Sequence, residues 1–132
     1  MRVPRLIPPA LILIIAVSAL AAPQLLPRAH AAPADILGVP LPPGTRIDTA
    51  RAGDGPGQPH LFVSGRGFRA TVEFYQRFLA RRGLLHQAIP VYRYRGTEIA
   101  RFLSRQPGTA WSAVHVYRDD ARTWIFIVPH TP

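Results

Sequence analysis

Proline is concentrated in the first half of this chain, and its distribution limits where regular structure can form. Eleven of the 15 prolines precede residue 60, and the remaining four stand at positions 90, 107, 129 and 132. A proline has no backbone N–H, so it interrupts helix interiors and the inner strands of sheets. We therefore predict an extended Pro/Gly-rich lead-in over 32–59 and an α+β domain over 60–132, with a compact part that starts near residues 37–45.

The first 31 residues have the three parts of a secretory signal peptide. Two arginines among the first five residues precede an uncharged run at 10–22, and small-x-small cleavage sites end at Ala21 and Ala31. The site at Ala31 is favoured because the chain turns polar there. The alternative is an uncleaved signal anchor through residues 10–26, since a membrane-spanning helix takes about 17–25 residues. The expected location is periplasmic or secreted, or, in the alternative, anchored to the inner membrane.

Cysteine content and charge narrow the chemistry further. The chain has no cysteine, which excludes disulfides and a lipid-modified cysteine at the cleavage site. All 16 basic residues are arginines, and 13 of them follow Ala32 against seven acids, so the mature part carries about +6. This charge favours an anionic envelope component as partner, with a protein partner or a merely solvated surface as alternatives. No run of four basic residues occurs, so no specific nucleic-acid site is predicted.

Residues 68–82 carry the clearest helix pattern. Phe68, Val72, Tyr75 and Leu79 recur at helical spacing, with charged residues on the opposite face. Gly83 is a suitable end, because glycine accepts the left-handed conformation that follows many helices. The preceding segment Ser64–Gly67 is interpreted as the turn that enters the helix, with an anion-binding turn as the alternative.

Strand patterns flank this helix. They cover residues 60–64, 84–95, 111–118 and 123–129, and more weakly 45–50. Residues 98–105 fit either a helix or a strand, and the strand is favoured because helix caps are lacking. Because of Pro90, its strand either lies at a sheet edge or starts after residue 90. The last two strands are expected to form an antiparallel hairpin, and residues 123–129 are the most apolar and therefore central. The predicted fold is an α+β two-layer sandwich, with one main helix packed on an antiparallel sheet of four to five strands. The expected core consists of Phe62, Val72, Tyr75, Phe78, Leu79, Phe102, Val114, Val116, Ile125 and Ile127.

No catalytic, metal or cofactor site is predicted from the titratable residues. The histidines lack the HxH or HxxxH spacing of metal ligands, and His115 alternates with Val114 and Val116, which indicates an exposed position. One enzymatic alternative stays open, a small hydrolase that uses His115 with Glu98 or Asp119.

The segment that follows Pro90 combines aromatic residues with arginines. Tyr92 and Tyr94 share one strand face, and Arg93 and Arg95 share the other. Aromatic rings beside arginine bind bases or sugars, although tyrosines in a sheet also serve as packing residues. These four residues and His115 are the candidate binding residues.

Two short motifs resemble those of small exported bacterial α+β proteins of unknown function. They are the lead-in Pro40-Leu41-Pro42-Pro43-Gly44 and the helix Phe74-Tyr75-Gln76-Arg77-Phe78-Leu79-Ala80-Arg81-Arg82-Gly83. The resemblance implies an α+β fold and an envelope location, and it implies no catalytic residue. The functional hypothesis is a non-catalytic binding or interaction module of the cell envelope, with a membrane-anchored accessory subunit as the alternative.

Overall fold

A computed structural model describes residues 31–48 and 57–131. The segment interpreted as a signal peptide or anchor lies outside the described residues, apart from its last position. The same is true of positions 49–50 of the weak strand and of most of the glycine-rich loop before Gln58. In the described residues no helix is long and apolar enough to cross a membrane.

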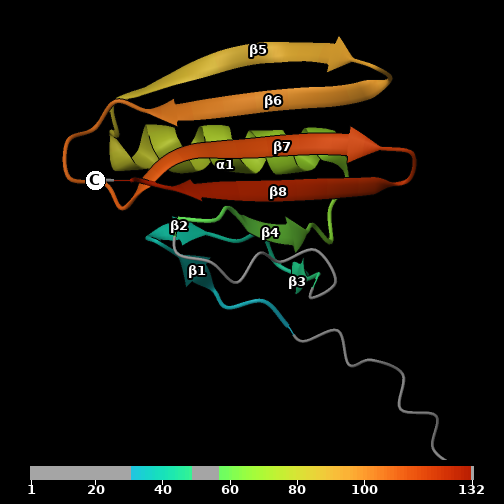
Figure 1. Cartoon of the computed structure of the whole chain (residues 1–132), viewed down its shortest axis with the longest axis horizontal. Helices are drawn as coiled ribbons and strands as arrows, with labels where there is room; N and C mark the ends of the chain where they lie inside the picture. Colours follow the sequence, from blue (N-terminus) through green and yellow to red (C-terminus); the bar gives the residue numbers. More distant parts are fainter. Residues whose placement is uncertain (1–30, 49–56, 132) are drawn as a thin grey trace, which may run out of the picture.

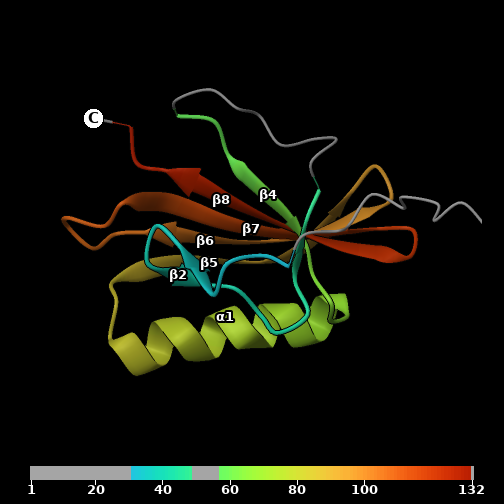
Figure 2. The ribbon, with the colours of Figure 1, turned by 90° about the horizontal axis from the view of Figure 1, so that it is seen from below.

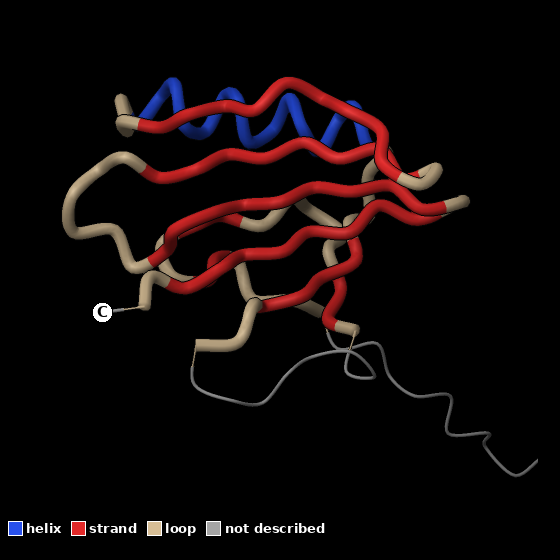
Figure 3. Tube along the Cα trace, turned by 45° about the horizontal axis from the view of Figure 1, so that its top comes forward, coloured by secondary structure: helices blue, strands red, loops and turns tan. Residues whose placement is uncertain are grey.

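One helix and eight strands make up the described part of the chain. They are β1 (Asp35–Ile36), β2 (Val39–Pro40), β3 (Arg46–Ile47), β4 (His60–Val63), α1 (Phe68–Arg82), β5 (His86–Tyr94), β6 (Thr97–Ser104), β7 (Trp111–Asp119) and β8 (Arg122–Pro129). Six strands form the main antiparallel sheet in the order β3-β4-β8-β7-β6-β5, and β1 pairs with β2 (Figures 1 and 3). The α+β class is confirmed. The sheet is larger than the four to five strands predicted, because the short β3 pairs with β4 at its edge.

Strand positions follow the sequence patterns closely. The apolar β8 lies between β4 and β7 inside the sheet, and β7 and β8 form the expected hairpin. β5 is an edge strand, as Pro90 requires, and its pairing with β6 shifts register between Ile89 and Tyr92. A proline is tolerated at such a place because its missing N–H breaks no ladder hydrogen bond there.

The helix begins and ends where its flanking glycines predict. Gly83 has a positive φ of 58° and its N–H donates to the carbonyl of Ala80 at 3.1 Å, which closes the last turn. At the other end Gly67 is the N-terminal cap residue and gives no side-chain hydrogen bond. Instead Ser64 Oγ lies 2.8 Å from Thr71 Oγ1, which ties the entry turn to the first turns of α1.

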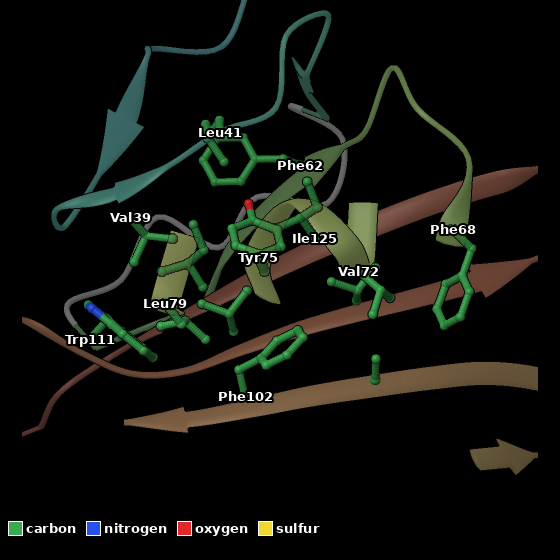
Figure 4. Close-up of a cluster of buried hydrophobic side chains, with 14 residues drawn as sticks. Val39, Leu41, Phe62, Phe68, Val72, Tyr75, Leu79, Phe102, Trp111 and Ile125 are labelled. Carbon is green, nitrogen blue, oxygen red and sulfur yellow. The ribbon is translucent and has the colours of Figure 1, made fainter. Parts of the chain in front are cut away.

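The core fills the space between α1 and one face of the sheet (Figures 2 and 4). Nine of the ten predicted core residues are buried, and Phe78 is half-buried and packs against the cluster. The residues that the sequence analysis missed are Val39, Leu41, Phe68, Ala100 and Trp111. Figure 4 shows Val39 and Leu41 on the same side of the sheet as Tyr75. The β1–β2 segment therefore belongs to the packed structure and does more than lead into it.

Candidate functional site

The sheet face that α1 does not cover carries a group of aromatic and basic side chains. Side chains alternate between the two faces of a strand, and paired residues share a face. Across the sheet Arg101 pairs with His115, and His115 pairs with Phe126. Two residues farther along the strands, and so on the same face, Tyr92 pairs with Ile99, and Ile99 pairs with Tyr117. We call Tyr92, Arg101, His115, Tyr117 and Phe126 the sheet-face cluster.

Direct contacts hold this cluster together. The guanidinium carbon of Arg101 lies 5.7 Å from the centre of the Tyr92 ring, within the range of a cation–π interaction. The rings of Tyr117 and Phe126 are 4.7 Å apart at an angle of 42°. Arg101 is exposed, and the four ring side chains are half-buried. The cluster therefore presents ring surface and one cationic group on the same side of the sheet.

Burial sets the charge state of the cluster. Desolvation lowers the pKa of His115 below its usual value of 6.5, and the positive charge of Arg101 lowers it further. Burial also raises the pKa of Tyr117, and Arg101 offsets part of that rise. His115 and Tyr117 are therefore neutral at pH 7, and Arg101 supplies the positive charge of the cluster. His115 lies on the face opposite Val114 and Val116, as the alternation predicts, and its side chain is partly buried.

The structure does not bring the other predicted binding residues into the cluster. Tyr94 lies at the end of β5, 57 % exposed, and the guanidinium of Arg95 sits 5.3 Å from its ring centre. Arg95 itself belongs to the β5–β6 turn and has a positive φ of 47°, so it does not continue the strand alternation. Arg93 occupies the helix side, where it contacts Glu98 at 3.4 Å.

The hydrolase alternative finds no assembled pair. Glu98 pairs in register with Arg118, whose guanidinium lies 2.7 Å from a Glu98 carboxylate oxygen on the helix side of the sheet. His115 points to the opposite face. Asp119 shares the face of His115 but lies four residues farther along β7, about 13 Å away, and it accepts a hydrogen bond from Trp124 Nε1 at 2.8 Å. Neither carboxylate is within hydrogen-bond reach of the imidazole.

Three members of the cluster were missed by sequence reasoning. Arg101, Tyr117 and Phe126 stand on three different strands, and no local motif links them. The signal that could have found them is the strand register, because pairing His115 with Phe126 and Arg101 places all three beside it. Within residues 31–48 and 57–131 no group of three potential metal ligands comes together.

Comparisons with known proteins identify no family for this chain. No family model, curated protein or solved structure gives a significant match to the chain.

Proposed function

We propose that this chain is an exported, non-catalytic binding module of the cell envelope that recognises an acidic polysaccharide through the sheet-face cluster. The observation that carries the proposal is the placement of Tyr92, Arg101 and the Tyr117–Phe126 ring pair side by side on the face opposite α1. Among the described residues Arg101 forms no ion pair. Its charge is therefore available to an anionic partner.

Acidic sugars match both chemical features of this face. An aromatic ring presents a flat apolar surface with a negative π face, against which the C–H groups of a sugar ring can pack. A guanidinium binds a carboxylate with two parallel N–H···O hydrogen bonds, which fixes the orientation of the sugar. The positive charge of the mature part, 13 arginines against seven acids, attracts a polyanion from a distance.

The N-terminal sequence supports the location in this proposal. A positive start, an apolar run and small-residue cleavage sites are typical of exported proteins. N-terminal sequencing of protein recovered from the envelope fraction tests this directly. A start after Ala31 is expected. A start at Met1 together with membrane association would instead support the anchored accessory subunit.

A binding experiment with matched variants tests the ligand class. We expect the chain to bind polygalacturonate, a polymer of uronic acid, and not neutral dextran in isothermal titration calorimetry. Tyr92→Ala and Arg101→Gln should each weaken binding about 5- to 100-fold, the range of one lost stacking or charged contact. Val91→Ala and Arg69→Gln are the controls, because these exposed residues line the groove between α1 and the sheet. Equal losses in Arg101→Gln and Arg69→Gln would show that only net charge matters and would contradict the proposal.

A further inference from the structure

Three arginines from separate parts of the chain surround one pocket at an end of the sheet. Arg46, Arg66 and Arg122 line an open pocket of about 630 Å³. Figures 1 and 2 show how this arises, because β3, the turn before α1 and the β7–β8 turn all lie at the same end of the molecule. The residues are far apart in sequence, so the fold alone creates this group, which we call the arginine pocket.

Well-defined backbone holds each arginine in place. Arg46 pairs with Val63 of β4, and Arg122 is the first residue of β8, opposite Asp119. The backbone N–H of Arg66 donates to Ser64 Oγ at 3.1 Å, which fixes the turn that carries it. All three side chains are exposed. Their guanidinium groups can therefore reach a ligand in the pocket while their backbone stays ordered.

Close backbone packing also shapes this turn. A Cβ added to Gly65 would lie 2.6 Å from the carbonyl oxygen of Gly44, so only glycine lets the turn approach residue 44 this closely. At Gly67 a Cβ would meet nothing within 4 Å, which leaves open space beside the start of α1. The pocket wall is thus tightly packed where it meets Gly44 and open at Gly67.

The described residues that line the arginine pocket carry an excess of positive charge. None of the three arginines forms an ion pair with a described residue. Among the described lining residues Asp48 is the one carboxylate, so their three positive charges against one negative charge leave a net +2. Like charges gathered around one concavity repel one another and attract a counter-ion of the opposite sign.

We propose that the arginine pocket binds a phosphate monoester group. A phosphate monoester carries close to two negative charges at pH 7 and offers three acceptor oxygens, which matches the net charge and the three guanidinium donors. Arginine binds phosphate in a planar, bidentate way that lysine cannot reproduce. A carboxylate would neutralise only one of the two excess charges. This inference goes beyond the proposed polysaccharide binding and does not depend on it.

A second arginine group in the same chain provides the matched control. Arg77, Arg81 and Arg82 also line a shared pocket with Phe74 and Phe78, and all three are exposed. Arg81 and Arg82 stand in the last turn of α1, where the negative end of the helix dipole already complements their charge. Neutralising this group changes the net charge of the protein as much as neutralising the arginine pocket does.

The test is an amide NMR titration of the whole chain with inorganic phosphate at constant ionic strength. We expect saturable shifts at Gly65, Arg66 and Gly67. The variant Arg46→Gln/Arg66→Gln/Arg122→Gln should lose at least tenfold in affinity, and Arg77→Gln/Arg81→Gln/Arg82→Gln should keep it. If the triple variant does not fold, the single change Arg66→Gln, at an exposed turn position, should weaken binding at least threefold. Non-saturating shifts, or equal losses in both arginine groups, would overturn the proposal.

Two further arms identify the source of the phosphate. Binding of glycerol phosphate with the same residue dependence would assign a soluble ester. Binding to phosphatidylcholine vesicles that contain phosphatidic acid, lost in the pocket variant and kept in the control, would assign a lipid headgroup. Tyr92→Ala should leave phosphate binding unchanged, so a failure of the polysaccharide proposal and a failure of this one can be told apart.

Discussion

The two faces of the main sheet are formed by alternate residues of the same strands, yet their side chains differ in burial. On the helix side Val116, Ile125 and Phe102 are almost completely buried beneath α1 and the β1–β2 segment. On the other side their strand neighbours Tyr117 and Phe126 remain half-buried, because the single described helix covers only one face. The first face is therefore closed off from solvent, whereas the second combines buried side chains such as Trp124 and Leu61 with rings that keep part of their surface exposed.

Truncating one aromatic residue on each face should give the largest contrast. Phe102→Ala removes a ring that is 1 % exposed, and it should cost about 3–5 kcal/mol of unfolding free energy because it leaves a cavity in the core. Phe126→Ala removes a half-buried ring and should cost about 1–2 kcal/mol, since solvent can fill the space. Urea unfolding of both variants measures the difference. Equal losses would mean that both faces are packed to the same degree and would break the comparison.

The helix-covered face could be predicted from the sequence, whereas the composition of the opposite face could not. Period-3.6 spacing in residues 68–82 and period-2 spacing in β7 and β8 each identify apolar side chains that must meet, and seven of the nine core residues that were predicted correctly lie in these elements. These are local signals. The sheet-face cluster depends on which strands are neighbours, which is a non-local property. The same holds for the arginine pocket, whose residues are separated by up to 76 positions, from Arg46 to Arg122.

A substitution in the β1–β2 segment can show how much this segment, in addition to α1, contributes to covering the helix side. Val39 of β2 is completely buried in the core cluster, although the prolines and glycines of residues 32–59 suggested an extended lead-in. Val39→Ala should lower the unfolding free energy by about 1–3 kcal/mol, since it deletes buried methyl groups. Val91→Ala is the matched control, because Val91 is 52 % exposed and should change stability by less than about 0.5 kcal/mol. If Val39→Ala were equally silent, α1 alone would account for the buried face.

One buried polar atom on the helix side, the Tyr75 hydroxyl oxygen, stands out because it is unpaired among the described residues. Tyr75 is fully buried, and its hydroxyl has no hydrogen-bond partner among the described residues. Tyr75→Phe should therefore stabilise the fold by about 1 kcal/mol, because an unpaired buried hydroxyl is costly. Burial also raises the pKa of Tyr75 above its usual value of 10.0, so the native protein should lose stability as the pH rises past about 10, where the unfolded chain ionises.

Thermal unfolding from pH 8 to pH 11 measures both effects on Tyr75. Tyr75→Phe should have the higher melting temperature throughout and a weaker loss above pH 10. Residual alkaline sensitivity is expected from Tyr117, whose pKa burial also raises. A lower melting temperature for Tyr75→Phe at neutral pH would mean that the hydroxyl forms a hydrogen bond that stabilises the fold.

The smallest expected effect is the pH response of the sheet-face cluster. The folded pKa of His115 lies below 6.5, because burial and then Arg101 disfavour the charged ring. The unfolded chain, with a pKa near 6.5, therefore binds a proton more readily, and stability should fall slightly as the pH drops below 6.5. His115→Gln should remove this loss, and Arg101→Gln should raise the His115 pKa seen in NMR titration. A His115 pKa unchanged by Arg101→Gln would show that the charge of Arg101 does not affect the protonation of His115. It would also mean that the cluster does not act as one charged surface, so the contrast between the two faces would then rest on packing alone.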